Sequence, residues 1–523
     1  MASSLVLTVD LGTSGPKVSV FDHEARLIDS AFHPVETIFT QDGGVEQNPR
    51  EWIDAIFKAY STIVQRGKFE TSQIETFNIS SHWSGTVPID ASGNTLMNGI
   101  IWMDSRGAHW AGQLTQGWPS IDGYNIFKIL KWIRITGGGP TKSGKDSIAH
   151  ILFIKNRLPH IYEKTTYFLE PKDYLNYYFC GRIAASYDSI TLHWVTDNRD
   201  INNIKYHDGL LRECGIDKAR LPELVPANSL LGEIKADIAE KMRLPKKVKV
   251  ISGAPDTHAA AVGSGAVKDF EGHIYVGTSG WLLTHVPFKK TDLFHNMATF
   301  PSSIPGRYLL MNEQETAGAC LNFIRDKICF PKDNISQFAA PENFYRLADE
   351  LVSQVPAGSN GVMFTPWLNG ERSPVDDHKL RATFINLSLN TTRADMIRAV
   401  YEGVANNMRW LMYHVEKLTS KRFDALRFIG GGANSDEWCQ IMADTLDREI
   451  WQIADPISAN ARGAALLALA ATGKISLNEV GSKVQVKKVF YPDKKLRTLY
   501  DERFELFKQI YLKQKKLFTR LEP

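Results

Sequence analysis

The sequence has few cysteines, little net charge and no long hydrophobic run. Its five cysteines among 523 residues form neither a Cys-x-x-Cys pair nor a Cys/His ladder, which argues against a disulfide scaffold and a zinc site. The net charge of +3 is too small to indicate a general nucleic-acid or membrane-binding surface. No segment approaches the roughly 20 apolar residues that span a bilayer, and the N-terminus lacks a signal-peptide pattern. We therefore expect a cytoplasmic protein that binds neither nucleic acid nor membrane.

The pattern along the chain predicts an α/β fold with two related domains. The composition, 43% hydrophobic, is that of a globular protein, and 523 residues exceed what one hydrophobic core usually serves. Residues 5–22 and 273–286 each read as an apolar strand, a Gly-Thr-Ser-Gly turn and a returning strand. A basic turn at 241–249 indicates a boundary, so the expected domains are 1–250 and 251–523. The final helix, which carries an aromatic stripe, is free in this prediction to pack back on the first domain.

The two Gly-Thr-Ser-Gly turns are candidate phosphate sites. The backbone N–H groups of a glycine turn can approach an anionic phosphate because no Cβ blocks them. Asp10 ends the strand before the first turn, and Lys17 follows it. A carboxylate beside a phosphate is unfavourable unless a divalent cation lies between them, so Asp10 is a candidate partner of Mg²⁺. The alternative for Asp10 is a carboxylate that only closes a β-turn.

Asp256 is the candidate catalytic residue. It lies directly after a predicted strand and before a predicted helix. A carboxylate in that position can accept the proton of a substrate hydroxyl while the oxygen attacks phosphorus, as a general base. The same spacing also suits a helix N-cap, and both roles can hold together.

Two further glycine-bearing segments lead to opposite predictions. Gly430-Gly-Gly-Ala-Asn-Ser435 follows a strand and precedes a helix that Ser or Asn is expected to cap. This is a platform on which a nucleotide can lie against bare backbone. Gly139-Pro-Thr-Lys-Ser-Gly-Lys145 resembles a phosphate loop. However, Asp146 stands where that loop needs a metal-binding hydroxyl, and no convincing strand precedes it. We predict a flexible loop there.

Seven short motifs, in this order, together resemble the FGGY family of carbohydrate kinases, and most of all its xylulose kinase branch. The likeness spans roughly residues 5–475. The motifs are Asp10-Leu-Gly-Thr-Ser-Gly-Pro-Lys17, Trp102-Met-Asp-Ser-Arg106, Pro171-Lys-Asp-Tyr-Leu175, Gly253-Ala-Pro-Asp256, Gly277-Thr-Ser-Gly280, Gly370-Glu-Arg-Ser-Pro374 and Gly430-Gly-Gly-Ala-Asn-Ser435.

The resemblance implies two actin-like, ribonuclease-H-like domains flanking a catalytic cleft, with sugar held mainly by the first and ATP by the second. It implies that Asp256 is the base and Asp10 the Mg²⁺-ATP partner. The implied nucleotide-binding residues are Gly12, Thr13, Ser14, Lys17, Gly277, Thr278, Ser279, Gly431, Gly432, Ala433 and Asn434. The implied substrate-binding residues are His82, Trp83, Ser84, Trp102, Asp104, Arg106, Asp256 and Thr257. A homodimer is also a family-level expectation.

The sequence departs from xylulose kinases in the sugar pocket. Those enzymes typically carry Gln-Met-His-Gly where this chain has His82-Trp-Ser-Gly85, so Ser84 replaces the sugar-contacting histidine. Thr257 stands in place of the common Asn, and His258 is similar to a residue of some ribulose kinases. The expected activity is ATP-dependent phosphorylation of a ketopentose such as D-xylulose, giving the 5-phosphate. The alternatives are a kinase of ribulose or another ketose or polyol, and, in a different class, an actin-like nucleotide switch or a sugar-binding regulator.

Overall fold

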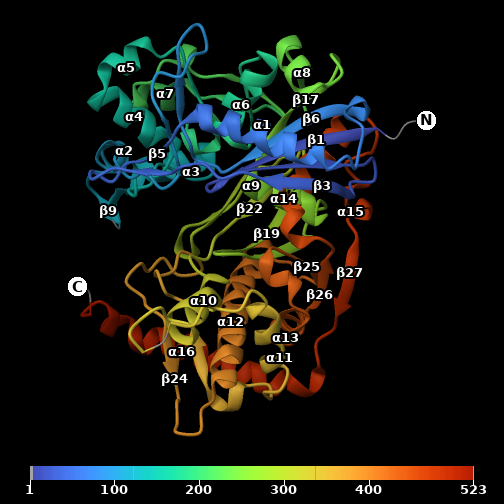
Figure 1. Cartoon of the computed structure of the whole chain (residues 1–523). Coiled ribbons are helices and arrows are strands. Elements are labelled where there is room, and N and C mark those ends of the chain that lie inside the picture. Colours follow the sequence, from blue (N-terminus) through green and yellow to red (C-terminus); the bar gives the residue numbers. More distant parts are fainter. Residues whose placement is uncertain (1–3, 122, 336, 522–523) are drawn as a thin grey trace.

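The computed structural model describes residues 4–121, 123–335 and 337–521. The chain forms two lobes, one above the other in Figure 1. The first lobe is built on a six-stranded sheet in the order β16-β17-β6-β1-β2-β3. Strands β1, β6 and β17 run parallel to one another, while β2, β3 and β16 are antiparallel to their neighbours. The bounds are β1 Leu5–Gly12, β2 Gly15–Phe21, β3 Leu27–Phe32, β6 Ile74–Ser81, β16 Leu230–Glu233 and β17 Lys249–Pro255.

The second lobe repeats this pattern in an eight-stranded sheet, in the order β20-β21-β22-β19-β18-β25-β26-β27. An antiparallel hairpin, β18–β19, again lies beside parallel strands, β25 and β26. The bounds are β18 Gly272–Val276, β19 Gly280–Val286, β20 Thr291–Asp292, β21 Met297–Pro301, β22 Tyr308–Met311, β25 Ala425–Ile429, β26 Glu449–Ile453 and β27 Val486–Phe490. The expected two-domain α/β fold is therefore confirmed.

Helices cover the outer faces of both sheets. In the first lobe α1 (Pro49–Gln65), α6 (Pro171–Cys180) and α8 (Ala236–Met242) enclose one core. Helix α1 begins where the side chain of Asn48 accepts from the N–H of Arg50. In the second lobe α12 (Arg393–Thr419) is the central helix, and it begins with a capping box between Thr392 and Asp395. Its companions are α10 Ala319–Phe323, α11 Phe344–Val352, α13 Asp436–Leu446, α15 Val480–Lys483 and α16 Arg497–Phe518.

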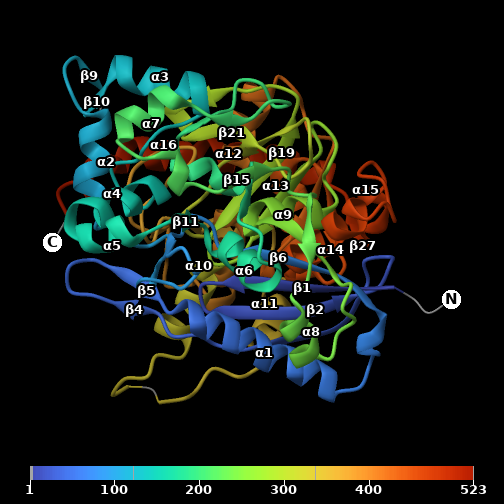
Figure 2. The same ribbon diagram turned by 90° about the horizontal axis from the view of Figure 1, so that it is seen from above.

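A helical cap, formed by residues 108–121, 123–169 and 184–214, lies to one side of the first sheet (Figure 2). It contains α2 Ala108–Thr115, α3 Ile126–Thr136, α4 Ser147–Arg157, α5 Pro159–Lys164 and α7 Asp208–Cys214. The cap also contacts the second lobe: the Phe300 ring lies 5.6 Å from that of Trp194, and Ser303 Oγ donates to Asp188 at 2.6 Å. These contacts join the two lobes on the cap side.

Shorter strands complete the first lobe and the cap. They are β4 Ile38–Phe39, β5 Val45–Gln47, β7 Val87–Ile89, β8 Gly99–Ile100, β9 Ser120–Ile121, β10 Tyr124–Asn125, β11 Tyr167–Leu169, β12 Ala184–Ser186, β13 Thr196–Asp197, β14 Lys205–Tyr206 and β15 Glu223–Val225. The second lobe adds β23 Met363–Thr365 and β24 Thr383–Ile385.

The chain does not change sheets at residue 250. That residue falls inside β17, which pairs with β6 of the first sheet through Pro255. The basic turn at 241–249 is thus the surface approach to a strand of the first lobe. The final helix α16 packs on α12 and α13 of the second lobe, where Phe507 contacts Trp367 and Trp410.

Two helices, α9 (Asp256–Ser264) and α14 (Ala459–Ala471), lie between the sheets (Figure 1). They share a core with residues of both lobes, and α14 covers β1, β6 and β17 although it follows the second sheet in sequence. The helices cross very closely. A Cβ on Gly263 would lie 1.8 Å from the carbonyl oxygen of Ala459, and one on Gly463 would lie 1.8 Å from that of Ala259. Only glycine permits this approach.

No helix among the described residues is long and apolar enough to cross a membrane.

The close crossing of α9 and α14 predicts that adding a single methyl group there lowers the stability of the fold strongly. Gly463→Ala should lower the free energy of unfolding by about 3 kcal/mol or more, because the new Cβ meets backbone that cannot move aside. Gly112→Ala in α2 is the control, since a Cβ there has nothing within 4 Å, and it should be neutral or gain up to about 1 kcal/mol. Urea unfolding measures both. Equal stability of the two variants would contradict the close crossing.

Candidate active site

The first turn joins β1 to β2 and presents Asp10 to the space between the lobes. Asp10 lies opposite Lys17 in the hairpin, and Gly12 opposite Gly15. The side chain of Asn460, in the first turn of α14, lies close to Asp10. Burial raises the pKa of Asp10, and the charge of Lys17 and the side chain of Asn460 oppose this rise. Asp10 is thus a carboxylate whose negative charge is only partly compensated by the protein.

Asp256 is the first residue of α9, directly after β17. Because β17, β6 and β1 are parallel, their carboxyl ends meet at one edge of the sheet and bring Asp256 near Asp10. Burial raises the pKa of Asp256 to about 7, and the charges of Asp10 and Glu313 add to this rise. The N–H of Thr257 donates to Asp256 Oδ1 at 2.7 Å. Pro255 occupies the N-cap position, so the N-cap alternative is wrong and Asp256 keeps its carboxylate for the cleft.

The second turn, residues 277–280, joins β18 to β19. It is fixed from behind, because the N–H of Gly318 donates to the carbonyl of Gly277 at 2.7 Å and that of Ala317 to Thr278 at 2.9 Å. Ser279 hydrogen-bonds to the carboxylate of Glu313. The backbone of the turn therefore faces the same space as the carboxylates.

Tyr275 connects the second turn with the carboxylates. Its ring stacks on Trp281 at 3.8 Å. Burial raises the pKa of Tyr275 to about 12, and the charges of Asp256, Asp10 and Glu313 contribute. Three carboxylates from both lobes thus lie within electrostatic range of one phenol.

Glu313 and Asn460 are site residues that the sequence reasoning missed. Glu313 follows β22 and accepts from Arg372 Nη1 at 2.6 Å. Its pKa is raised chiefly by burial, although 42% of the side-chain surface is exposed. Arg372 belongs to the Gly370–Pro374 motif, whose Glu371 anchors the loop by accepting from the N–H of Glu315 at 2.9 Å. Neither Glu313 nor Asn460 belongs to a recognisable sequence motif. Each becomes a site residue only through a contact with a residue that is distant in the sequence.

The third glycine segment, residues 430–434, lies at the end of β25. Ser435 caps α13 by accepting from the N–H of Trp438 at 3.0 Å, as the sequence predicted. Gly430 has a φ of +86°, and a Cβ there would lie 2.7 Å from the carbonyl oxygen of Val276. A Cβ on Gly431 would have nothing within 4 Å, and Gly431 and Asn434 are exposed, whereas Gly432 and Ala433 are buried. The segment offers open backbone beside the second turn's strand.

The loop after β6 forms the first lobe's side of the cleft. His82 is buried edge-on to Trp52 at 6.0 Å, and burial lowers its pKa to about 4, so it is neutral at physiological pH. Trp83 Nε1 donates to the carbonyl of Ser189 at 2.9 Å, and its ring stands edge-on to His258 at 5.1 Å. The loop thus contacts α9 two residues beyond Asp256.

Ser84 is turned toward the cap. Its φ is +61°, and its Oγ donates to the carbonyl of Lys145 at 2.5 Å. The N–H of Gly85 donates to Glu170 at 2.8 Å. The hydroxyl at the position of the family's histidine is therefore engaged with protein backbone.

Trp102 braces the first turn, while Asp104 and Arg106 pair with each other. Trp102 Nε1 donates to Thr13 Oγ1 at 3.0 Å. Asp104 is buried and accepts from Arg106, which also pairs with Glu46 at 2.6 Å. The charges of Asp104 and Arg106 thus compensate each other. Of the three motif residues, Trp102 is the one that contacts Thr13, a predicted phosphate-binding residue.

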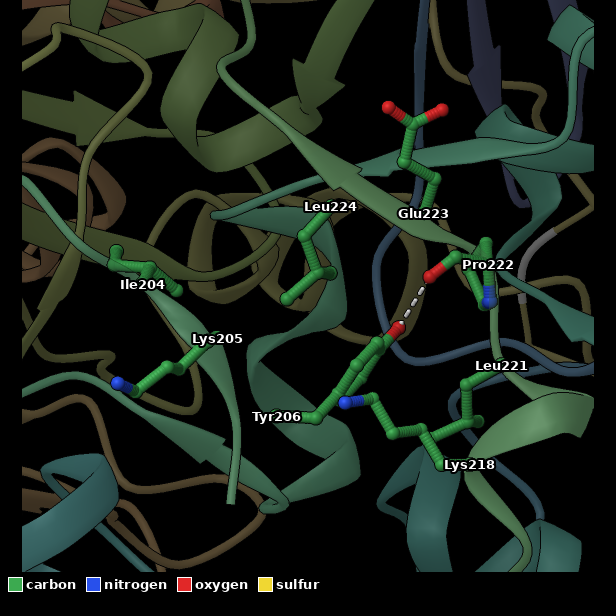
Figure 3. Close-up of a pocket in the computed structure, with 8 residues that line it drawn as sticks. All are labelled: Ile204, Lys205, Tyr206, Lys218, Leu221, Pro222, Glu223 and Leu224. Carbon is green, nitrogen blue, oxygen red and sulfur yellow. Dashed lines mark hydrogen bonds between the residues drawn. The ribbon is translucent and has the colours of Figure 1, made fainter. Parts of the chain in front are cut away.

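The pocket drawn in Figure 3 is a different place. It lies in the first lobe between Lys205, Tyr206 and residues 218–224, where Tyr206 donates its hydroxyl proton to the carbonyl of Pro222 at 2.7 Å. None of the predicted site residues lines it. The cleft between the lobes, where the carboxylates and glycine turns converge, is the stronger candidate.

Comparison with known families agrees with the fold. Residues 5–263 match the N-terminal domain of the FGGY family of carbohydrate kinases, and residues 272–472 match its C-terminal domain. The chain therefore belongs to the FGGY family of carbohydrate kinases and is a sugar kinase. The resemblance found in the sequence is confirmed.

The similar proteins are named either as xylulose kinases or as gluconate kinases. The xylulose kinase of Staphylococcus epidermidis is 27% identical over 532 residues, which span 100% of this chain and 99% of the relative. The crystal structure of a gluconate kinase from Lactobacillus acidophilus has a TM-score of 0.85 at 23% identity, over 99% of this chain and 100% of that one. A ligand-bound xylulose kinase from the same organism has a TM-score of 0.84 at 23% identity, again over 99% and 100%.

The raised pKa of Asp256 predicts a cost in stability. In the folded protein its pKa is about 7 and in the unfolded chain 3.8, so stability falls as the pH rises between these values. Asp256→Asn removes the penalty. The variant should be more stable than wild type by about 1–2 kcal/mol at pH 8, the full shift being reduced by solvent screening, and should show no such gain near pH 4.

Thermal unfolding at both pH values, with Asp54→Asn on the exposed side of α1 as the control, measures this difference. A gain at pH 8 no larger than at pH 4 would contradict the raised pKa.

Proposed function

We propose that this chain transfers the γ-phosphoryl group of ATP to a hydroxyl of a ketopentose, D-xylulose first among them, giving the 5-phosphate. The observation that carries the proposal is Asp256, a carboxylate with a pKa of about 7 at the junction of the two lobes, facing the first phosphate turn. A base with a pKa near the working pH takes a proton most efficiently. The names of the xylulose kinase relatives support this sugar.

In this proposal the two turns hold the phosphates. Backbone N–H groups at Gly12, Thr278 and Ser279 bind the phosphate oxygens, while the N–H of Gly277 donates to the carbonyl of Ser279 and holds the turn. The open backbone at 431–434 supports the adenosine. Thr13, Ser14 and Lys17 contact the phosphoryl group that is transferred. Asp256 accepts the proton of the attacking hydroxyl, and the closing of the lobes excludes water that would compete as acceptor.

The residues present fit a Mg²⁺ ion that is held chiefly by the nucleotide. Among residues 4–121, 123–335 and 337–521 no group of three or more His, Cys, Asp or Glu side chains could hold a metal by itself. Mg²⁺ commonly takes one or two carboxylates together with substrate phosphates. Asp10, whose charge is only partly compensated, would be that ligand, and the ion would neutralise charge on the phosphates.

The acceptor is held by the first lobe. In this proposal the rings of Trp83 and Trp102 and the side chains of His82, Ser84 and Thr257 contact the sugar. Asp104 and Arg106 hold this part of the first lobe in place through their ion pair. We also propose a cytoplasmic location and, on the family resemblance, a homodimer. The names of the gluconate kinase neighbour and of a gluconokinase relative make a sugar acid the second candidate acceptor.

A panel of D-xylulose, D-ribulose, D-gluconate and polyols, assayed with Mg²⁺-ATP by coupled ADP release, tests the activity. D-Xylulose should give the highest kcat/KM. If no sugar raises ADP release above background, the kinase proposal fails in favour of a nucleotide switch or a sugar-binding regulator.

Asp256→Ala should reduce kcat by about 10²–10⁴-fold with nucleotide affinity near wild type, because only the base is lost. In the wild type kcat/KM should rise with pH through an apparent pKa of about 7, since the base acts when deprotonated. A flat profile between about pH 6 and 8, or retention of most of the turnover, would refute the assignment.

Ser84→His should change the ratio of kcat/KM for D-xylulose to that for D-ribulose by about tenfold, because an imidazole replaces a hydroxyl engaged with Lys145. Ser84→Ala, which only removes the hydroxyl, is the matched control. If both variants keep the wild-type ratio, this position does not read the sugar.

A further inference from the structure

The loop between α3 and α4 presents one exposed lysine between two buried anchors. Gly144 is buried, and a Cβ there would lie 2.3 Å from the backbone nitrogen of Ala108. Asp146 is 6% exposed and accepts from the N–H of Thr141 at 2.6 Å and from Trp194 Nε1 at 2.9 Å. Lys145, between them, is exposed. A helix precedes the segment, which confirms that it is not a phosphate loop of the strand-loop-helix kind. The two buried anchors fix the segment in place, whereas the sequence predicted a flexible loop.

Lys145 is tied to the acceptor side of the cleft. Its carbonyl accepts from Ser84 Oγ at 2.5 Å. The neighbouring Ser147 donates to Glu170, which also accepts from the N–H of Gly85 at 2.8 Å. The backbone at residues 145–147 and the loop at residues 84–85 therefore form one braced unit, from which the lysine side chain starts.

The charge of Lys145 acts across the cleft. It lowers the pKa of Glu313, a residue of the second lobe, against the raising effects of burial and of Glu315. Glu313 in turn hydrogen-bonds to Ser279 of the second turn and adds to the raised pKa of Asp256. The lysine thus reaches the region between the predicted base and the nucleotide turn.

The two arginines near the cleft, Arg372 and Arg106, are already compensated by ion pairs. Arg372 pairs with both Glu313 and Glu315, and Arg106 with Asp104 and Glu46. In the part of the chain that the structure describes, Lys145 forms no close ion pair and interacts with Glu313 only at longer range. Its ammonium is available to an anionic ligand.

We propose that Lys145 is a catalytic residue that binds the transferring phosphoryl group from the first lobe, exchanging its long-range partner Glu313 for the phosphate oxygens. This inference rests on the proposed function. In phosphoryl transfer, negative charge is spread over the three equatorial oxygens, and a cation aimed at them stabilises the transition state. A carboxylate on a sugar acid offers similar anionic oxygens, so the test separates the two.

The test compares Lys145→Met, Lys145→Arg and the control Lys142→Met, which lies in the same loop with its ammonium 4.4 Å from the ring of Tyr124. With D-xylulose, Lys145→Met should lower kcat by about 10²–10³-fold and Lys145→Arg should restore part of it. Lys142→Met should stay within about twofold, because it keeps the loop and removes only a remote charge. The bond from Ser84 survives in each variant, since the backbone carbonyl accepts it.

Two readouts distinguish a phosphate contact from other roles. ADP lacks the group in transfer, so the Kd for ADP should be unchanged in Lys145→Met. Sugar-independent ATP hydrolysis should fall by a factor similar to that for transfer, since the phosphate is the same. Hydrolysis at the wild-type rate, or a loss seen with D-gluconate and absent with D-xylulose, would overturn the proposal in favour of an acceptor contact.

The role of Lys145 and the proposed kinase function can fail independently of each other in these experiments. If the wild type phosphorylates no sugar, the kinase proposal fails, while ATP hydrolysis still reports on Lys145. If the wild type is active and Lys145→Met keeps its kcat, only the present inference fails. Equal melting temperatures of the variants exclude misfolding as the cause of a loss.

Discussion

The architecture depends on the close crossing of α9 and α14 between the two sheets. At Gly263 and Gly463 the backbones touch without any side chain between them. Each helix also supplies a group to the cleft: α9 begins with Asp256, and α14 carries Asn460 close to Asp10. The pairing of β1, β6 and β17 sets the distance between Asp256, the proposed base, and Asp10, the proposed metal ligand, and the helix crossing holds Asn460 beside them, so loops have little part in it. A site built on packed helices holds its geometry more tightly than one on loops.

The cleft concentrates negative charge that the rest of the molecule balances. Asp10, Asp256 and Glu313 each have a raised pKa, chiefly through burial. Such a cluster is unfavourable in the empty protein and becomes favourable when a cation and polar ligands enter. The overall charge of +3 needs no basic surface, because the anionic partner is one small nucleotide met by backbone N–H groups and a few cations.

Sequence alone predicted the parts that are local in the chain. The two hairpin turns, the carboxylates at the strand ends and the Ser435 cap depend on neighbouring residues, and each could be read from a short pattern. Residues whose role depends on partners that are distant in the sequence could not be predicted in this way. Asn460 lies in the first turn of an alanine-rich helix, Glu313 follows the inner strand β22, and Lys145 lies in a segment that only resembles a phosphate loop. The membership of β17 in the first sheet was hidden because strand pairing with β6 leaves no local signal.

The position of α14 has a consequence for how the molecule folds. This helix comes late in the chain, yet it covers β1, β6 and β17 of the first sheet, and Asn78 of β6 donates to the carbonyl of Ala464 at 2.7 Å. Until α14 has been synthesised, one face of the N-terminal sheet is left uncovered and apolar. The first half of a nascent chain is therefore an incomplete folding unit, and the two lobes are expected to gain and lose their structure as one cooperative body.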